Sequence, residues 1–484
     1  MNQSVLQQKL GALAAFSGGE ADNVEKLGRI LESLDRWGLY RINPLRFAAE
    51  HGFEPVAAID LFVRGAKIGL FDLEWNMICP LCGGVEHNYT TIDQIDPDRF
   101  HCTFCNQDVD SRLDQQVEAA FSLNKGVAAP ALDPYAGFAD YWRYYFSDNF
   151  AWAPAVNDYM DREVIRSFTG VGPSGAASVR FDAKPGDLFR LVSVERHAAL
   201  EMRFDAAAGA APIVVDADLL ASGFSPKAVS LPAGEVTVRV RSHLSLPAGL
   251  LLQFCDHARI EKLISGNRSS MAPFLTGKML INNQMFRELF RAQHLPYNLK
   301  LKVGNVTILF TDLKGSTELY DNTGDMAAYN LVQEHFELLK ASAHEHSGAL
   351  VKTMGDAIMA SFSSPLDSLK AAVGMMTGID AMKARYRKAG HRFGLKIGMH
   401  EGPVLAVNAN DTLDYFGQTV NIAARVQGLA DEGEIWLTEQ AYEAGGVKEL
   451  MAAAGRRVEK RTAVLKGVRG NATVFKCRVS GETP

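Results

Sequence analysis

Residues 308–317 read ILFTDLKGST, and this stretch decides how the last third of the chain is interpreted. Ile308 to Thr311 have the apolar and β-branched character of a buried strand. Asp312 follows directly. A carboxylate beside a buried strand costs free energy to desolvate unless a cation pairs with it. The stretch therefore predicts a strand that ends at a charged site, and it raises the question of what neutralises Asp312.

A second carboxylate stands in a similar context in VKTMGDAIMASF, residues 351–362. Residues 351–353 and 358–362 have strand character, and Met354-Gly355-Asp356 is typical of the turn between them. If this hairpin lies beside the strand that carries Asp312, the two carboxylates converge. Such a pair suits a hard divalent cation such as Mg²⁺, whose coordination shell substrate phosphates can complete. A helix start after Asp312 would offer backbone N–H groups to the same phosphates.

A third stretch, LDYFGQTVNIAARV at residues 413–426, adds a carboxylate and a cation. Asn421 and Arg425 are four residues apart in an apparent helix and therefore share a face. Taken singly, Arg425 could pair with a core carboxylate, and Asp414 and Lys352 could be ordinary surface charges.

Together, ILFTDLKGST, VKTMGDAIMA and LDYFGQTVNIAARV resemble the three signature segments of the class III adenylyl/guanylyl cyclase catalytic domain. The resemblance covers residues 303–480 and implies an α+β, ferredoxin-like domain that works as a head-to-tail homodimer with sites at the interface. The sequence upstream, including GLFDLEWNMICPLCGG, is similar to an uncharacterised region found ahead of some bacterial cyclases. That second resemblance implies no function.

The resemblance also assigns roles to single residues. Asp312 and Asp356 match the metal-binding aspartates, which would hold two Mg²⁺ or Mn²⁺ ions per site. Asn421 matches the residue that orients the ribose, and Arg425 matches the one that stabilises the pentavalent phosphorus. The implied reaction is attack of the ribose 3′-oxygen on the α-phosphorus while pyrophosphate leaves.

Lys352 and Asp414 match the pair that reads the purine, and Lys466 matches a late lysine that contacts the triphosphate. A lysine donor and an aspartate acceptor suit N1 and N6 of adenine, so ATP is the expected substrate and adenylate cyclase the expected activity. The alternatives are a guanylate or pyrimidine nucleotide cyclase, and a non-catalytic regulator that senses nucleotides or binds nucleic acid.

Four of the six cysteines form two CxxC motifs, which are separated by 19 residues: Cys79, Cys82, Cys102 and Cys105. Two such motifs can supply four thiolates to one tetrahedral Zn²⁺, and a closed S₄ site is structural rather than catalytic. Four unrelated buried thiols and a redox pair are the alternatives. We therefore predict a zinc ribbon with one structural Zn²⁺.

The rest of the chain predicts five segments before the catalytic domain. They are a helical, winged-helix-like segment (1–70), the zinc ribbon (71–112), an aromatic-rich connector (113–162), a β-sandwich expected to be regulatory (163–262) and a linker helix (263–302). Asn43-Pro44 is a helix-start signal and Gly52 a stop signal in the first segment. An ordinary helical packing module is the alternative there, because the second helix offers only Arg64 and Lys67 to phosphates.

Composition limits the possible partners. Apolar residues make up 47% of the chain and charged residues 22%, which is normal for globular proteins. The formal charge of −6 argues against a nucleic-acid partner. No apolar run approaches the ~18 residues of a membrane span, and the N-terminus lacks signal-peptide character. We therefore expect a cytoplasmic protein with no membrane partner, and an unknown regulatory ligand or protein on its N-terminal region.

Overall fold

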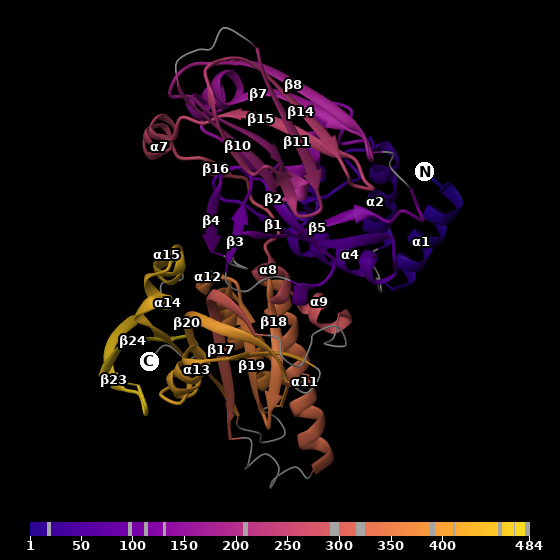
Figure 1. The fold of residues 1–484 in the computed structure, drawn as a ribbon. Coiled ribbons are helices and arrows are strands. Elements are labelled where there is room, and N and C mark those ends of the chain that lie inside the picture. Colours follow the sequence, from indigo (N-terminus) through magenta and orange to yellow (C-terminus); the bar gives the residue numbers. More distant parts are fainter. Residues whose placement is uncertain are drawn as a thin grey trace.

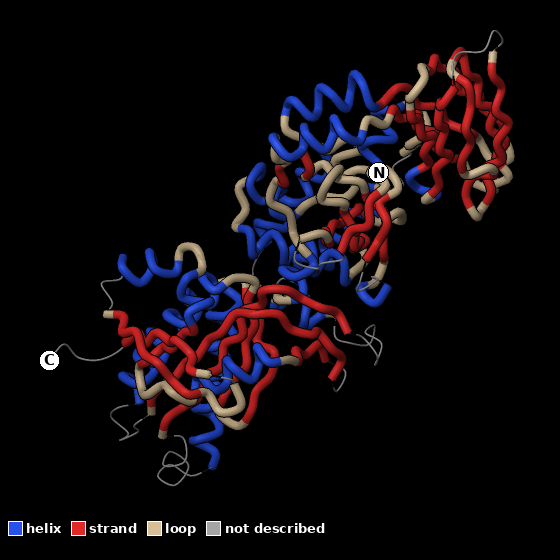
Figure 2. The backbone as a smooth tube through the Cα atoms, turned by 60° about the vertical axis from the view of Figure 1, so that its left-hand side comes forward, coloured by secondary structure: helices blue, strands red, loops and turns tan. Residues whose placement is uncertain are grey.

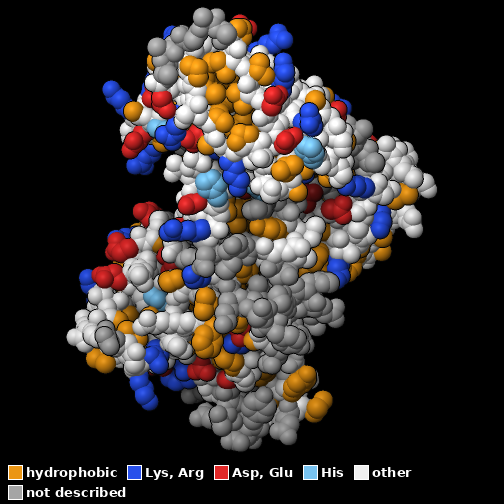
Figure 3. Space-filling model, viewed as in Figure 1, with side chains coloured by type: hydrophobic (Ala, Val, Ile, Leu, Met, Phe, Trp, Pro, Cys, Tyr) orange, Lys and Arg blue, Asp and Glu red, His pale blue; other side chains and the backbone are white. Residues whose placement is uncertain are grey.

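The computed structural model describes residues 1–16, 21–94, 99–110, 115–128, 132–206, 212–290, 300–315, 325–386, 393–409, 412–453, 457–468 and 470–479 of the 484-residue chain. A helix-rich part with a small sheet lies between a structure of two sheets and a final domain that mixes helices and strands (Figures 1 and 2). Figure 3 shows acidic and basic side chains on both the upper and the lower part of one face. Among the described helices, none has the length and apolarity that a bilayer crossing requires.

The described chain begins with helices α1 (Gln3–Phe16), α2 (Ala21–Ser33), α3 (Pro44–His51) and α4 (Pro55–Lys67). The sequence signals at α3 are confirmed. Asn43 accepts a hydrogen bond from the backbone N–H of Leu45 at 3.1 Å, and Gly52 ends the helix with a φ of +63°. Helix α4 buries most of its circumference, including Ile59, Leu61, Phe62 and Val63. A helix enclosed in this way cannot enter a nucleic-acid groove, so the structure does not support the winged-helix-like prediction.

The next part contains a small sheet and a hairpin. The three-stranded antiparallel sheet has the order β2 (Val85–Tyr89), β1 (Phe71–Ile78), β5 (Val117–Leu123), and β3 (Arg99–Cys102) pairs with β4 (Gln107–Asp110). The rings of Phe71 and Phe121 pack on Phe62 of α4, so helices and sheet share one core. Strand β5 lies in the segment predicted as a connector. It is buried along its whole length and therefore shows no period-two alternation in the sequence.

Two further sheets follow after α5 (Phe138–Tyr145), β6 (Phe150–Ala151), α6 (Pro154–Tyr159) and a π-helical turn (Met160–Val164). One sheet has the order β13-β10-β9-β15-β7 and the other β12-β11-β14-β8. Their strands are β7 (Ile165–Val171), β8 (Ala176–Ala183), β9 (Leu188–Ser193), β10 (Ala198–Ala206), β11 (Ile213–Leu220), β12 (Gly223–Ser225), β13 (Ala228–Pro232), β14 (Gly234–Ser242) and β15 (Ala248–Phe254). Val236, Val238 and Val240 alternate inward, as a half-buried strand requires, and the apolar faces of both sheets form one core.

The segment predicted as one linker helix differs from that prediction. Its described residues hold the end of α7 (His257–Gly266), followed by β16 (Ser270–Met271), α8 (Gly277–Ile281) and α9 (Gln284–Leu289). Asn283 separates α8 from α9 because its side chain accepts a hydrogen bond from the backbone N–H of Phe286 at 2.8 Å and so caps a new helix. An asparagine that caps a helix start favours a break over continuation, which the apolar spacing of residues 275–290 concealed.

The final domain has a βαββαβ core. Its elements in chain order are β17 (Lys300–Lys314), α11 (Asp325–Glu345), β18 (Gly348–Met354), β19 (Ala357–Phe362), α12 (Pro365–Tyr386) and β20 (Gly394–Ala409). The strand order β18-β19-β17-β20 is that of a ferredoxin-like sheet. The sheet continues through β22 (Glu434–Thr438), β24 (Asn471–Arg478) and β23 (Val458–Val464), while β21 (Thr412–Phe416) pairs with β20. Helices α13 (Gln418–Gln427), α14 (Glu439–Glu443) and α15 (Val447–Ala453) complete the domain.

Strand β17 is buried on both faces. Leu309 and Leu313 belong to the core that α11 and α12 complete, whereas Ile308 and Phe310 pack in the core that contains Ala423 of α13. Because successive side chains of a strand point to opposite faces, Asp312 shares the face of Ile308 and Phe310. Because other elements cover both faces of β17, its side chains on both faces are apolar, and the sequence shows a continuous apolar run.

The helix-rich part is joined to the final domain by polar contacts, among which the carboxylate of Asp60 is buried. Asp60 of α4 is 2% exposed, and its carboxylate accepts from Asn283 Nδ2 at 3.1 Å and pairs with His344 Nε2 of α11 at 3.0 Å. Lys340 of α11 pairs with Glu288 of α9 at 2.7 Å. A buried carboxylate is costly without donors, so Asp60 favours the docked arrangement that supplies both.

This contact predicts a pH-dependent stability. The hydrogen bond to Asp60 raises the pKa of His344 above its ordinary value, burial acts in the opposite direction, and Glu288 adds to the rise while Arg64 reduces it. A raised folded-state pKa stabilises the folded protein below the unfolded pKa of about 6.5, and this stabilisation is lost as pH rises through the folded value. We expect the difference in melting temperature between unchanged protein and His344→Gln to be largest near pH 5.5 and to shrink towards pH 9.

Scanning calorimetry across this pH range measures the difference. His257→Gln, which changes an exposed histidine at the start of α7, is the control and should show no such trend. A His344→Gln difference that stays constant with pH would contradict the assignment.

Candidate active site

Asp312 lies within β17, two residues before its end, so the strand runs further than its apolar residues predicted. Its register partner on β20 is Lys396, whose Nζ forms an ion pair with Oδ2 of Asp312. The side chain of Asp312 is 34% exposed and that of Lys396 is 22% exposed. Lys396 therefore neutralises the carboxylate in this structure. The sequence analysis missed Lys396 because only the β17–β20 register reveals the pairing.

Asp356 lies in the turn between β18 and β19, as predicted. The register pairs Phe310 with Met359, and the backbone N–H of Ile358 donates to Oγ1 of Thr311 at 3.2 Å. These contacts bring the hairpin tip alongside the part of β17 that carries Asp312. The helix start expected after Asp312 falls on residues 316–324, which lie outside the described residues.

A buried histidine lies behind this turn. His335 of α11 is fully buried, and burial lowers its pKa to about 4, while the backbone and the negative charge of Asp356 act in the opposite direction. At neutral pH an uncharged ring therefore lies against the turn, and it adds no positive charge that would compete for the Asp356 carboxylate.

Lys352 of β18 and Asp414 of β21 form a direct ion pair, with 2.7 Å between Nζ and Oδ2. The β18–β19 register shifts between Leu350 and Lys352, and such a bulge re-aims the side chains that follow it. Lys352 is 40% exposed and Asp414 is 17% exposed, so the pair is accessible from solvent. The structure thus brings together a donor and an acceptor that are 62 residues apart in sequence.

Asn421 and Arg425 lie on α13, where Asn421 is exposed and Arg425 is partly exposed. The helix lies close to β20 because Gly398 has no side chain: a Cβ there would be 2.0 Å from the backbone nitrogen of Gln427. Lys466 lies in the turn between β23 and β24 and is exposed. The next residue, Gly467, faces the guanidinium of Arg425, which brings Lys466 and Arg425 into the same neighbourhood.

The predicted site residues fall into separate groups. Asp312 and Asp356 lie at the end of β17 and the adjacent turn, Lys352 pairs with Asp414, and Arg425 lies beside the turn of Lys466. Among the described residues, no hydrogen bond or ion pair joins either of the first two aspartates to Asn421 or Arg425.

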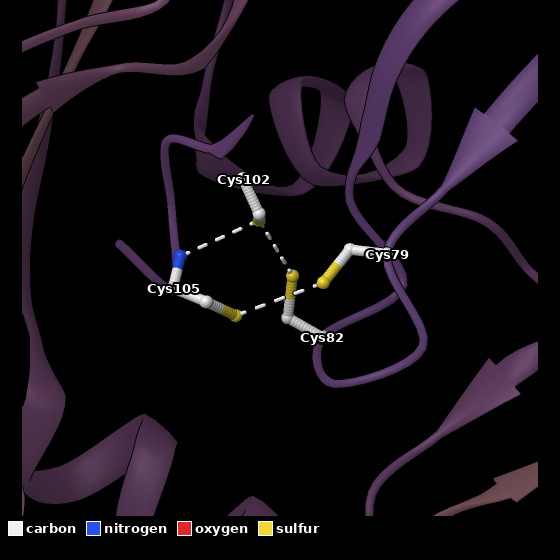
Figure 4. A group of neighbouring side chains, drawn as sticks. All are labelled: Cys79, Cys82, Cys102 and Cys105. Atoms are coloured by element: carbon white, nitrogen blue, oxygen red, sulfur yellow. Dashed lines mark hydrogen bonds between the residues drawn. The ribbon is translucent and has the colours of Figure 1, made fainter. Parts of the chain in front are cut away.

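The four CxxC cysteines form one cluster (Figure 4). Their sulfur atoms all lie within 4.8 Å of one another, with 3.6 Å between Cys82 and Cys102 and 4.0 Å between Cys79 and Cys105. Tetrahedral zinc with Zn–S bonds of about 2.3 Å requires sulfur atoms about 3.8 Å apart. The thiol positions therefore fit such an ion.

Two family models match the chain. Residues 300–475 match the adenylate and guanylate cyclase catalytic domain, and residues 4–165 match a family of unknown function. Residues 300–475 form a class III nucleotide cyclase domain. The ferredoxin-like core and the three signature segments all lie within this cyclase domain.

Curated relatives are similar to part of the chain. An adenylate cyclase of Mycosarcoma maydis is 33% identical over 180 residues, which are 33% of this chain and 7% of the relative. A guanylate cyclase 2G of Mus musculus is 25% identical over 230 residues, covering 46% of this chain and 19% of the relative. The chain thus spans only a small part of these relatives' length.

Solved structures are also similar. The adenylyl cyclase CyaB of P. aeruginosa is 19% identical, with a TM-score of 0.33 over 38% of this chain and 97% of that one. The guanylyl cyclase Cya2 is 21% identical, with a TM-score of 0.34 over 38% and 95%.

The contact between Gly467 and Arg425 generates a prediction about the cyclase domain. Gly467 has a φ of +77°, and an added Cβ would lie 3.2 Å from Nη1 of Arg425. Gly467→Val should therefore strain the turn and also displace the guanidinium, with loss of at least about tenfold in cyclase activity, or ~1.4 kcal/mol of barrier.

Gly470→Val is the matched control. Gly470 has a similar φ of +81°, but a Cβ there would meet no atom within 4 Å. Both variants should lose similar thermal stability through backbone strain. Only Gly467→Val should lose most activity, and equal activities in steady-state assays would contradict the proposed contact.

Proposed function

We propose that this protein is an adenylate cyclase that converts ATP into 3′,5′-cyclic AMP and pyrophosphate. The observation that carries the proposal is the Lys352–Asp414 pair, which presents a donor and an acceptor side by side in the cyclase domain. Adenine offers the N1 acceptor and the N6 amino donor, so Lys352 would donate to N1 and Asp414 would accept from N6. Guanine offers a protonated N1 and an O6 acceptor instead, which reverses both requirements.

Binding of adenine would exchange one set of polar contacts for another. In the absence of nucleotide, the lysine and the aspartate satisfy each other. A base that offers both complementary groups can replace this contact without leaving a charged group unpaired, whereas a mismatched base cannot. A site built from such groups discriminates strongly, because unpaired polar groups are costly.

The phosphate end of the reaction needs positive charge. Arg425 would contact the equatorial oxygens of the α-phosphorus as charge develops there, since its planar fork suits phosphate better than a lysine does. Lys466, on the neighbouring turn, would contact the triphosphate. Asn421, four residues before Arg425 on the same helix, would orient the ribose so that its 3′-oxygen lies in line with the departing pyrophosphate.

Asp312 and Asp356 are the residues that would hold Mg²⁺ or Mn²⁺. Both offer oxygen ligands, and Asp312 is partly open to solvent and, among the described residues, pairs with the ammonium of Lys396. Bound divalent cations would acidify the 3′-hydroxyl and neutralise charge on the phosphates. Lys396 would have to give up its contact with Asp312, after which its charge remains close to the phosphates.

We further propose that two copies of the chain form a head-to-tail homodimer. The metal-binding aspartates of one chain would then complete a site with Lys352, Asp414, Asn421 and Arg425 of the other. The absence of contacts between these groups among the described residues of one chain supports this arrangement. Because each chain carries both groups, a homodimer would have two equivalent sites.

The decisive experiment is a panel of ATP, GTP, CTP and UTP with Mn²⁺ and purified full-length protein, with product analysis by chromatography. Cyclic AMP as the main product supports the proposal. Another cyclic nucleotide would favour a guanylate or pyrimidine cyclase, and no product would favour a nucleotide-sensing regulator.

Reversing the base contacts should change the substrate. Lys352→Glu combined with Asp414→Cys exchanges a donor for an acceptor and removes a competing carboxylate. We expect the ratio of kcat/KM for ATP over GTP to fall at least about tenfold. The single variant Lys460→Gln removes one exposed positive charge on β23 and so changes the net charge by the same amount as the double variant, for which it is the control. An unchanged ratio in the double variant would show that this pair does not read the base.

Subunit mixing tests the shared sites. Asp312→Ala and Arg425→Ala should each be inactive, because each removes one half of both sites. Random re-pairing makes half of the dimers mixed, and every mixed dimer has one site with both changes and one with neither. About a quarter of the original activity should therefore return if the sites are independent. Exchange verified by differently tagged chains, but without recovered activity, would place each site within one chain.

We also propose that Cys79, Cys82, Cys102 and Cys105 hold one structural Zn²⁺. The spacing of their sulfur atoms supports this, and three of the four cysteines are buried. The loop between Cys102 and Cys105 is in turn held by the two-sheet structure: Arg190 of β9 donates to the carbonyls of Thr103 and Phe104 at 3.0 and 3.3 Å. Binding of the ion would therefore also stabilise this contact.

Removal of the four-thiolate site should destabilise this part of the protein. We expect about one zinc per chain by elemental analysis, and none in Cys79→Ser/Cys82→Ser. Hydrogen exchange should rise in residues 71–110 and in β9, while the cyclase domain stays protected. Cys255→Ser, a thiol outside the cluster, is the control. Absence of zinc from the unchanged protein, together with unchanged hydrogen exchange in Cys79→Ser/Cys82→Ser, would refute the zinc site.

A further inference from the structure

The strands that carry Lys352 and Asp414 are both tied to one short segment, residues 282–288, which runs from the end of α8 through α9. We infer that this segment sets the relative position of Lys352 and Asp414, so that its polar residues determine nucleotide selectivity. Residues 282–288 are called the connector from here on, and the name no longer refers to the aromatic-rich segment 113–162. This inference rests on the proposed reading of the base by that pair.

The first contact is to β18. The side-chain oxygen of Gln284 accepts a hydrogen bond from the backbone N–H of Leu350 at 2.8 Å. Leu350 lies two residues before Lys352, at the point where the β18–β19 register shifts. Gln284 is 7% exposed, and its amide nitrogen donates to Glu288 at 2.7 Å, which fixes its orientation. The connector thus supports the bulge from which Lys352 projects.

The second set of contacts is to β21. Arg287 donates through Nη2 to the carbonyl oxygen of Leu413 and through Nη1 to that of Ile281 at 3.1 Å. Its guanidinium also lies over the ring of Tyr415, 5.5 Å from the centroid. The hydroxyl of Tyr415 donates to Oδ1 of Asn282 at 2.8 Å. The residues on both sides of Asp414 are therefore held by the connector.

The hydrogen bond between Tyr415 and Asn282 is buried, which makes it a directional constraint. Asn282 is fully buried and Tyr415 is 2% exposed, so neither polar group can turn to water without opening the core. The Asp414 carboxylate accepts from the backbone N–H of Tyr415 through Oδ1 at 2.8 Å and from Lys352 through Oδ2 at 2.7 Å, so its orientation depends on the position of the Tyr415 backbone. A shift of the connector by a fraction of an ångström would change the Lys352–Asp414 separation, and hydrogen-bond energies fall steeply with such changes.

The same segment is fixed on its other side by the helix-rich part. Asn283 donates to Asp60, and Phe286 packs edge-on against Trp75 of β1, with centroids 5.9 Å apart. A six-residue helix with neighbours on two sides transmits displacement as a rigid body. A partner or ligand that displaced α4 or β1 would therefore change the contacts of Lys352 and Asp414 with the base before it changed the contacts of the protein with the phosphates.

Gln284, Asn282 and Arg287 are thus positioning residues, since they act through Lys352 and Asp414. Arg287→Met removes both guanidinium donors but keeps an apolar side chain of similar length. Tyr415→Phe removes one hydroxyl and leaves its ring in place. Lys340→Met is the matched control, because it removes the ion pair of Glu288 on the same helix but leaves in place the hydrogen bonds of Gln284, Arg287 and Asn282 with β18 and β21.

The experiment measures kcat and KM for ATP and GTP in full-length protein. Relative to unchanged protein, Arg287→Met should lose at least about tenfold in the ratio of kcat/KM for ATP over GTP, mainly through a higher KM for ATP. Tyr415→Phe should lose about threefold, and Lys340→Met should stay within about twofold. A purely structural role would lower the active fraction, and therefore kcat, equally for both nucleotides.

The outcomes separate the inference from the proposed function. If unchanged protein forms no cyclic nucleotide or does not discriminate between purines, the proposed base reading fails and the inference fails with it. If unchanged protein discriminates and Arg287→Met and Tyr415→Phe keep the full ratio, only the inference is overturned. Should Arg287→Met not fold, Tyr415→Phe against Lys340→Met decides the question alone.

Discussion

The long antiparallel pairing of β17 with β20 is the constraint on which the cyclase domain depends. It sets Asp312 opposite Lys396 and places β19 with its turn along the other edge of β17. Strand β20 also pairs with β21 and offers Gly398 as the surface on which α13 lies. Each group of site residues is therefore positioned by these two central strands, and a slip in their register would move all of them together.

Charge at the candidate site is balanced by ion pairs that the proposed substrate complex would break. Lys396 neutralises Asp312, and Lys352 neutralises Asp414. Both pairs are partly exposed, so their net contribution to stability is small, roughly 0–1 kcal/mol. Weak internal pairs of this kind keep the polar groups oriented while leaving them available for exchange with a metal ion or a purine.

The N-terminal region meets the cyclase domain through a buried carboxylate, Asp60, and a partly exposed histidine, His344. Asp60 accepts from Asn283 and His344, and it has no solvent to replace either donor. Buried polar contacts of this kind add specificity of docking more than they add stability, since unsatisfied groups exclude other arrangements. They give the region of unknown function a defined mechanical path to α9, and from there to β18 and β21.

The sequence by itself determined the local features, because these depend on neighbouring residues. The strand at Ile308, the turn at Asp356, the helix of Asn421 and Arg425, the α3 boundaries at Asn43 and Gly52, and the clustering of two CxxC motifs all follow from short-range patterns. The signature segments also identified the cyclase domain. The catalytic roles of its residues stay predictions.

Only the tertiary structure decided the pairings between distant segments. Lys396 meets Asp312 through a strand register, and Arg287 reaches Leu413 from a helix in the linker. The family resemblance predicted that Lys352 and Asp414 act as a pair, and the structure adds their direct contact across 62 residues. No local pattern in a single sequence marks such partners, since their proximity depends on how the whole sheet twists and which helix covers its edge. The break at Asn283 was missed for the same reason: the cap serves a docked helix whose partners, Asp60 and Trp75, lie more than two hundred residues earlier.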